Sequence, residues 1–170
     1  MLGFRVSFPR GQFSPAHSEW LWSAAEERDF PLMVWAPGQL SELKEAARRH
    51  PGARVAVDHL GTAPDDRGNR VRETIRELLP LAELENVAVK ASSLPAHSTG
   101  LYPFMDLHEA VREVVRAFGP SRVFWGSDLT TLSCSYEDAV RMFTDALGFD
   151  AGDLEQIMGS AIAKWLRWKV

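Results

Sequence analysis

The chain has 170 residues, of which 45% are hydrophobic and 25% are charged, and its formal net charge is -4. This length and composition predict one globular domain over residues 1–170, and the acidic balance with scattered Lys and Arg argues against nucleic-acid binding. The single cysteine, Cys134, excludes an intramolecular disulfide and a thiolate zinc site, and no run approaches the ~18 apolar residues of a membrane span. We therefore expect a cytoplasmic protein without nucleic-acid or membrane partners.

Five short β-rich runs alternate with amphipathic helical patterns along the chain. The apolar residues in these runs are continuous, which is typical of parallel strands that are covered on both faces. Strands are predicted at residues 3–8, 31–36, 53–58, 86–91 and 122–127.

The segments between the strands carry signals for helices. A capping residue before a proline, a Ser/Asp-x-x-acid pattern and a Pro-Gly or Gly-Pro stop each mark a helix end. Helices are expected after Ser14–Pro15, over 39–50, after a capping box of Asp106 and Glu109, after Ser135 with Asp138, and from about Asp150 to Trp168.

This alternation predicts an α/β fold of five successive βα units. Such units form a parallel sheet with right-handed crossovers, either open or closed into a barrel. In both forms the chemistry gathers where the carboxyl ends of the strands meet. Asp58, His59, Ser92 and Asp128 all fall at such ends, so we expect one shared site.

The third strand ends on an acid and an imidazole in the run RVAVDHLGTAP, residues 54–64. His59 could polarise a carbonyl, hold a water or bind a metal, because imidazole titrates near neutral pH. The alternative is a histidine that is hydrogen-bonded to loop backbone. Since side chains alternate along a strand, Asp58 is expected to point to the opposite side and to hold a loop.

Other polar residues in or after strands have two interpretations each. Asp128 either meets a metal, a substrate or a cation, or it caps the next helix. Lys90, inside NVAVKASSL, either binds a substrate anion or neutralises Asp128, and Arg5 in the first strand has the same two interpretations. Trp35 either packs in the core or forms the wall of a pocket.

The remaining histidines and the cysteine carry weaker signals. His17, His50 and His108 lie on helical patterns and are expected at the surface. His97, in the loop after the fourth strand, could reach the site, but a solvated loop position is favoured. No base stands near Cys134 in the sequence, which argues against a nucleophilic role.

Four motifs together resemble the amidohydrolase-related family often named amidohydrolase 2. They are RVAVDHLG, NVAVKASSL, FGPSRVFWGSDLT and DLEQIMGSAIAKWL, and the resemblance extends from about Gly3 to Trp168. It implies metal-dependent hydrolysis on a TIM (β/α)8 barrel, often of lactones, or in some members decarboxylation of an aromatic or unsaturated acid. The five units then correspond to strands 4 to 8 of a partial barrel.

The resemblance also implies roles for individual residues. His59 matches the histidine of strand 6, which stabilises an oxyanion or orients the water, and Asp128 matches the aspartate of strand 8, which contacts the metal and acts as the base. Lys90 and Arg5 match positions where the family tends to place basic residues, and we assign them to substrate-anion binding. Trp35 lies near a position that often carries a metal-binding histidine. The implied metal is zinc or manganese, but the His-x-His pair of strand 1 has no counterpart here, so the ligand set is incomplete.

Two hypotheses from different classes follow. In the first, the chain is part of an amidohydrolase-type enzyme that attacks a lactone, ester or amide carbonyl of a small anionic substrate and needs further barrel strands for full activity. In the second, it is a non-catalytic remnant that binds a small anionic ligand or a partner chain. Five strands leave two sheet edges and an uncovered inner face, which favours a homo-oligomer or a complementing N-terminal fragment.

Overall fold

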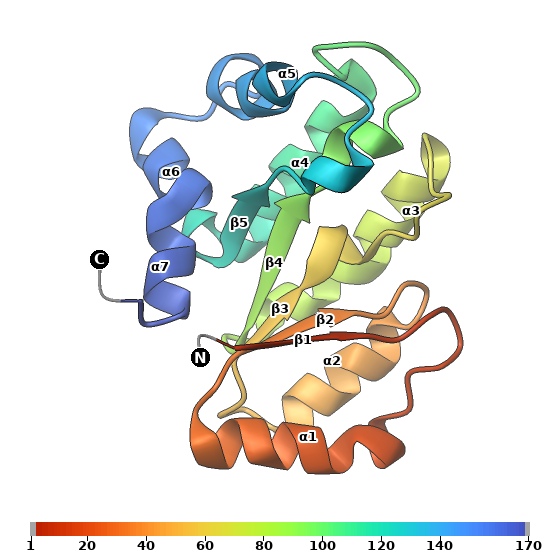
Figure 1. Cartoon of the computed structure of the whole chain (residues 1–170), viewed down its shortest axis with the longest axis vertical. Helices are drawn as coiled ribbons and strands as arrows, with labels where there is room; N and C mark the ends of the chain where they lie inside the picture. The colour runs from red at the N-terminus through yellow and green to blue at the C-terminus, as the bar shows by residue number, and fades with distance from the viewer. Residues whose placement is uncertain (1–2, 169–170) are drawn as a thin grey trace.

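The computed structural model describes residues 3–168, and within them five strands form one parallel sheet in the order β1-β2-β3-β4-β5 (Figure 1). The register aligns Val6, Val34, Val57, Val89 and Val123 in one row across all five strands. The predicted α/β fold with five parallel strands is confirmed. The strands are β1 (Phe4–Ser7), β2 (Leu32–Trp35), β3 (Val55–Val57), β4 (Val87–Ser92) and β5 (Val123–Gly126).

Helices follow every strand. The predicted last helix is present as α6 and α7, which are joined by a π-helical turn at Gln156–Ser160. Among the helices of residues 3–168, none combines the length and apolarity that crossing a bilayer requires. The helices are α1 (Pro15–Arg28), α2 (Leu40–Arg49), α3 (Asn69–Leu78), α4 (Met105–Phe118), α5 (Tyr136–Arg141), α6 (Ala151–Glu155) and α7 (Ala161–Trp165).

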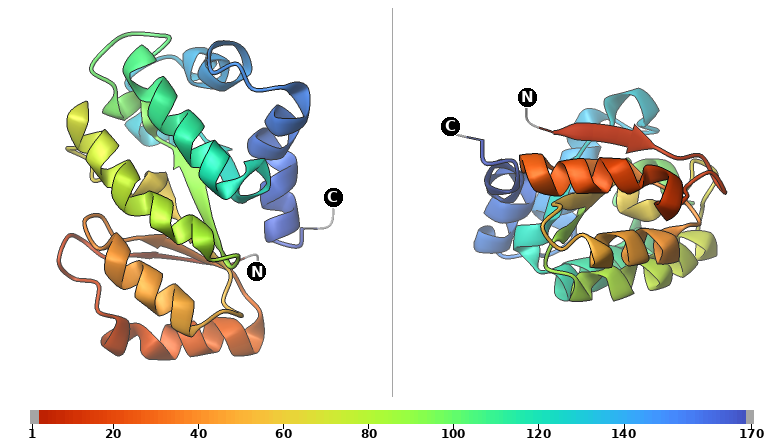
Figure 2. Two further views of the ribbon diagram at one scale, coloured as in Figure 1. Left: turned by 180° about the vertical axis from the view of Figure 1, so that it is seen from behind. Right: turned by 90° about the horizontal axis from the view of Figure 1, so that it is seen from below.

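Helices α1 to α4 cover one face of the sheet (Figure 2). The valines of the strands pack there against the apolar stripes of the helices, such as Leu43 of α2 and Ile75 of α3. Because each apolar position along a strand or helix recurs at the period of that element, one continuous core forms between the two layers. This layer fixes the sheet, and thereby the positions of the strand ends.

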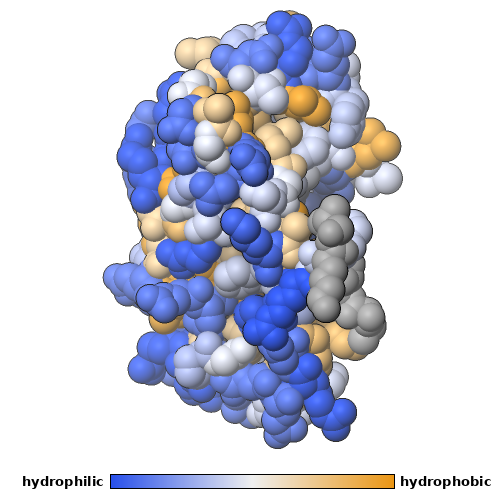
Figure 3. Space-filling model, turned by 90° about the vertical axis from the view of Figure 1, so that its left-hand side faces the viewer, coloured by the Kyte–Doolittle hydropathy of each residue, from blue (hydrophilic) through white to orange (hydrophobic). Residues whose placement is uncertain are grey.

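The opposite face of the sheet is covered in part by the C-terminal helix α7. Ala56, Ala88 and Phe124 form a second buried cluster with Ala161, and the ring of Phe124 lies 5.8 Å from that of Trp165. The expectation of an uncovered inner face is therefore wrong for this part of the sheet. Small alanine side chains on β3 and β4 let the helix approach closely. The side of the molecule that includes α6 and α7 is mostly hydrophilic on its outer surface (Figure 3).

The helix starts agree only in part with the sequence signals. Ser135 accepts a hydrogen bond from the backbone N–H of Asp138 at 3.0 Å, which confirms that cap. Ser14 precedes α1 but its side chain makes no capping bond. The capping box at Asp106 is wrong, because α4 starts at Met105 and the Asp106 carboxylate accepts a hydrogen bond from the backbone N–H of Thr99 at 2.8 Å. Asp106 thus holds the preceding loop.

Candidate functional site

The ends of β3, β4 and β5 lie side by side and place polar residues of three loops together. β3 pairs with β4 and β4 with β5, so the chain leaves these three strands at one edge of the sheet. His59 follows β3, Ser92 is the last residue of β4, and Asp128 comes two residues after β5. The predicted convergence of these strand ends is therefore present.

The imidazole of His59 lies between a hydroxyl and a carboxylate. Its Nδ1 is 2.9 Å from Ser92 Oγ, and its Nε2 is 3.9 Å from Asp128 Oδ2. Burial lowers the pKa of His59, and although Asp58 and Asp128 act in the opposite direction, the net shift is downward. The ring is thus neutral at neutral pH, with one protonated and one bare nitrogen.

Asp128 is held by its own loop. The Thr131 hydroxyl donates a hydrogen bond to Asp128 Oδ2 at 2.8 Å. The other carboxylate oxygen of Asp128 makes no hydrogen bond within residues 3–168, so the group keeps accepting capacity toward a reactant. A carboxylate with a bare oxygen beside an imidazole can take up a proton from a bound water.

Three residues of the site have left-handed backbone conformations. The φ angles are 52° at His59, 63° at Ser93 and 50° at Asp128, one after each of the three strands. For a residue with a Cβ such a conformation costs about 1 kcal/mol or more, and strain of this kind concentrates at functional sites. The chain therefore turns sharply directly after each of the three strands.

Asp58 joins the two basic residues that were predicted to bind an anion. It is 0% exposed, and its carboxylate accepts a hydrogen bond from Arg5 Nε at 2.7 Å and forms an ion-pair contact with Lys90 Nζ at 2.8 Å. The expectation that Asp58 holds a loop is wrong, because it links β1 to β4. The interpretation of Lys90 as the neutralising partner of Asp128 is also wrong, because the carboxylate that it contacts belongs to Asp58.

A cavity of about 180 Å³ opens beside His59 and Asp128. Trp35 contributes to its wall, which is one of the two interpretations that the sequence left open, and the indole Nε1 donates a hydrogen bond to the carbonyl of Thr62 at 3.0 Å. Arg5 and Lys90 lie outside this wall. The cavity is lined by Trp35, His59, Thr62, Pro64, Arg67, Ser93, Ala96, His97, Asp128 and Thr131.

His97 belongs to this cavity rather than to a solvated loop. The side chain is buried, and Nδ1 donates a hydrogen bond to the carbonyl of Asp66 at 3.0 Å, while Nε2 is 3.0 Å from the Thr62 hydroxyl. Burial lowers the pKa of His97. The solvated position that the sequence favoured for His97 is therefore wrong.

Two further histidines also depart from the surface positions expected for them. His50 is buried between Glu26 Oε2 at 2.9 Å and Glu19 Oε1 at 3.0 Å. His108 is buried and bonds to the carbonyl of Pro103 at 2.6 Å. His17 is exposed, as expected. The ring of His50 lies where the end of α2 meets α1, a contact that helical periodicity does not reveal, whereas His108 bonds to the loop that precedes its own helix.

The sequence reasoning missed His97, Thr62 and Arg67 as residues of the site. One signal for them was present, because the loops 61–69 and 92–103 directly follow two neighbouring strands and therefore lie at the same edge of the sheet. The loops contain several polar residues, and only their folded path shows which of these face the cavity.

The described residues do not fit a metal site on their own. Within residues 3–168, no three His, Cys, Asp or Glu side chains are grouped as metal ligands would be. His59 and Asp128 are a pair, whereas a catalytic zinc site has three protein ligands. Ligands from outside this part of the chain would be needed.

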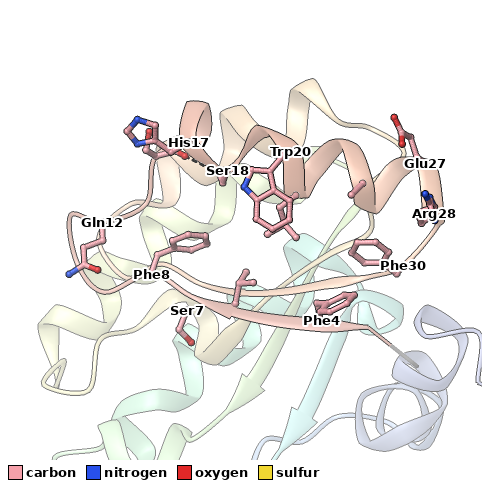
Figure 4. Close-up of a pocket in the computed structure, with 14 residues that line it drawn as sticks. Phe4, Ser7, Phe8, Gln12, His17, Ser18, Trp20, Glu27, Arg28 and Phe30 are labelled. Atoms are coloured by element: carbon pink, nitrogen blue, oxygen red, sulfur yellow. Dashed lines mark hydrogen bonds between the residues drawn. The ribbon is translucent and has the colours of Figure 1, made fainter.

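A larger groove lies away from this site, between β1 and α1. Its volume is about 700 Å³, and its walls include Phe4 and Phe8 of the β1 region and Trp20 of α1. Figure 4 shows Trp20 pointing from α1 toward β1 across this groove, with Phe4 and Phe8 on the other side. This groove lies along the edge strand of the sheet, where the backbone of β1 has one unpaired side.

Solved structures with the same fold match nearly the whole of this chain but are longer. An amidohydrolase from Burkholderia multivorans with bound zinc is 21% identical with a TM-score of 0.80, and the match covers 97% of this chain and 64% of that chain. A proposed 2-pyrone-4,6-dicarboxylic acid hydrolase from Pseudomonas putida is 20% identical with a TM-score of 0.78, and the match covers 100% of this chain and 64% of that chain. A 5-carboxyvanillate decarboxylase from Sphingomonas paucimobilis is 16% identical with a TM-score of 0.64, and the match covers 98% of this chain and 58% of that chain.

These likenesses establish the partial-barrel fold, and the chain spans less than two thirds of the length of these structures. No curated protein sequence matches the chain. A family model described as amidohydrolase, Amidohydro_2, matches residues 1–168. Since this match covers nearly the whole sequence, the chain belongs to the amidohydrolase 2 family.

Proposed function

We propose that this chain contributes the base and the oxyanion-stabilising group of a hydrolase that attacks a lactone, ester or amide carbonyl. The observation that carries the proposal is the pair formed by His59 and Asp128, 3.9 Å apart in the wall of one cavity. The two groups can act at the two places where charge develops during the attack of water on a carbonyl. One accepts the proton of the water, and the other donates to the oxygen on which negative charge develops.

In the proposed reaction the water oxygen attacks the carbonyl carbon while Asp128 accepts a proton from that water. His59 donates a hydrogen bond to the carbonyl oxygen as that oxygen becomes negative. When the tetrahedral intermediate collapses, the bond to the leaving group breaks and Asp128 returns the proton to the leaving oxygen or nitrogen. Thr131, which donates to Asp128 Oδ2, keeps the carboxylate in place during both transfers.

An anionic substrate fits the charges around the site. Asp58 carries one negative charge, whereas Arg5 and Lys90, which both contact it, carry two positive charges. The cluster therefore keeps one net positive charge, whereas Arg67 and Asp128 in the cavity wall carry opposite charges that balance each other. We propose that Arg5 and Lys90 attract the substrate anion in this way, with Trp35 as an apolar wall.

The cavity is too small to be a complete site. Its volume of about 180 Å³ lies below the ~300 Å³ at which ligand sites usually begin. We propose that further βα units complete the barrel and the cavity, and that the unit directly preceding β1 in the barrel binds in the groove between β1 and α1. The unpaired edge of β1 can take another parallel strand, and the aromatic side chains of the groove can pack against a helix.

A metal enters this proposal only with ligands from the completed barrel. Asp128 would then be one ligand of a zinc or manganese ion, and the solved relative with bound zinc supports such an ion for the family fold. The substrate could alternatively lose carbon dioxide, since another solved relative is a decarboxylase. A non-catalytic remnant that binds an anion remains the competing hypothesis. The single domain and the cytoplasmic location stay predictions.

The test is hydrolysis of lactones and aryl esters by the purified chain, with and without added zinc or manganese. It is repeated after coexpression with the N-terminal third of an amidohydrolase 2 relative. We expect Asp128→Asn to lower the rate by about 100-fold or more, in line with the usual contribution of a general base. Asp65→Asn is the matched control, because Asp65 is exposed and lies outside the cavity wall.

Three results decide between the hypotheses. Loss of activity in Asp128→Asn but not in Asp65→Asn supports the proposed base. Equal activity of both variants would refute the assignment of Asp128. Binding of a dicarboxylate without turnover in every preparation would favour the non-catalytic remnant.

A further inference from the structure

We propose that Ser92 is a positioning residue that holds the neutral His59 ring with its proton on Nε2. His59 then presents a hydrogen-bond donor, rather than a lone pair, toward Asp128 and the cavity. The tautomer follows from the hydrogen bond between Ser92 and His59 and from the position of Asp128 beside Nε2. The use of that donor at an oxyanion rests on the proposed function.

The hydroxyl of Ser92 has a single use in the structure. Ser92 is 3% exposed, and its Oγ lies 2.9 Å from Nδ1 of His59. Within residues 3–168, no other group forms a hydrogen bond with this hydroxyl. Because a buried O–H has to donate to some acceptor, and Nδ1 of His59 is the acceptor within hydrogen-bond distance among the described residues, the hydroxyl donates to Nδ1.

This direction decides where the imidazole proton is. A nitrogen that accepts a hydrogen bond is bare, so the single proton of the neutral ring is on Nε2. Nε2 is the atom that lies 3.9 Å from Asp128 Oδ2. The opposite tautomer would leave the Ser92 hydroxyl without an acceptor and would direct the Nε2 lone pair at a carboxylate. Both interactions therefore favour the same tautomer.

The packing of β4 against β5 holds Ser92 in this position. Ser92 is paired with Gly126 in the register, and a Cβ on Gly126 would come within 3.2 Å of the Cβ of Ser92. A side chain at position 126 would thus require Ser92 to shift by a few tenths of an ångström. The glycine leaves room for the two strands and for the serine hydroxyl at the end of β4.

The arrangement differs from that of a metal-binding histidine. A histidine ligand binds the metal through its bare nitrogen and donates its other N–H to a carboxylate or a carbonyl. In His59 the nitrogen that faces the cavity is protonated, and the bare nitrogen is occupied by the Ser92 hydroxyl. His59 is therefore built as a donor, which suits stabilisation of negative charge on a substrate oxygen.

The test is a long-range 1H–15N correlation spectrum of the 15N-histidine-labelled chain at pH 8, where the ring is neutral. The His59 signals are identified by their loss in His59→Gln. We expect the pattern of a protonated Nε2 and a bare Nδ1 in the wild type. In Ser92→Ala we expect the Nδ1 signal to move toward a mixture of the two tautomers.

Ser93→Ala is the matched control, because Ser93 is also buried after β4 but its hydroxyl pairs with Thr131 Oγ1 at 2.7 Å. We expect the tautomer of His59 to be unchanged in this variant. A wild-type ring protonated mainly at Nδ1 would overturn the proposal, as would a Ser92→Ala spectrum identical to the wild type. Neither result depends on catalysis, so a chain without hydrolase activity would leave this test intact.

Discussion

Replacing Lys90 by methionine tests how much the buried charge of Asp58 depends on its partners. The variant keeps the length and the apolar stem of the side chain but removes the ammonium that lies 2.8 Å from Asp58 Oδ1. Asp58 is 0% exposed, so its carboxylate depends on these contacts rather than on bulk water. Arg5 remains as the second partner, which limits the loss.

The magnitude follows from the position of the pair. At 2.8 Å two unit charges attract by about 6 kcal/mol at an effective dielectric constant of about 20, and by about 1.5 kcal/mol in water. The cost of desolvation offsets most of this attraction in the intact pair. Removing one partner of a buried pair usually costs about 3–5 kcal/mol, because the other charge stays buried. With Arg5 still in place we expect about 3 kcal/mol for Lys90→Met.

The assay is urea denaturation followed by tryptophan fluorescence. With a slope of about 2 kcal/mol/M, a loss of about 3 kcal/mol lowers the midpoint by about 1.5 M. Lys44→Met is the matched control: Lys44 also lies 2.8 Å from a carboxylate and is 28% exposed against 25% for Lys90, but its partner Glu83 is 74% exposed. We expect a loss of at most about 1 kcal/mol there.

A double-mutant cycle isolates the pair. In the Asp58→Asn background, where no charge is left to be stranded, Lys90→Met should cost less than about 1 kcal/mol. An equal cost of Lys90→Met in both backgrounds would refute the reasoning. The same conclusion would follow if Lys44→Met were as destabilising as Lys90→Met.

Three further predictions concern stability. Gly61→Ala should lower the free energy of unfolding, measured by chemical denaturation, by about 2 kcal/mol or more, since φ is +76° and the new Cβ would lie 2.9 Å from the side chain of Leu40. The control Gly11→Ala, with φ +78° and open space around it, should lower it by only about 1 kcal/mol. Burial lowers the pKa of His97, so the unfolded chain binds more protons than the folded chain as the pH drops below about 6.5, and the melting temperature should fall there. The variant His97→Gln should show a weaker dependence of the melting temperature on pH. An unchanged dependence in this variant would exclude His97 as the cause. Arg122→Lys should destabilise the fold by about 2 kcal/mol in a thermal melt, because the guanidinium donates hydrogen bonds to four backbone carbonyls. These carbonyls belong to Phe118, Leu84, Val87 and Ala82. A melting temperature equal to that of the wild type would contradict this role.

Local signals predicted the elements of the fold well. Runs such as VAV in β3 and the apolar stripe of α4 depend on the period of side chains along one element, and that period is visible in the sequence. The parallel order followed from the alternation of strands and helices. The prediction of a capping box at Asp106 was wrong because the carboxylate of such a residue can accept a hydrogen bond from the preceding loop instead of from the first turn of the helix.

Of the residues that line the candidate site, the sequence could predict only those that directly follow the strands. His59 and Asp128 stand at strand ends, and the register of the sheet brings them together as expected. His97 and Arg67 reach the cavity through loops whose path depends on contacts with other loops, such as the bond of His97 to the carbonyl of Asp66. No local pattern encodes such a path.

The sequence by itself determined the five βα units, the end of the sheet at which polar residues gather, and the places of His59 and Asp128 at that end. These features depend on residue type and on the spacing of neighbours along the chain. The tertiary structure decided which charges meet. Lys90 and Arg5 contact Asp58 rather than Asp128, and α7 covers part of the inner face, because partners distant in the sequence are chosen by sheet register and packing.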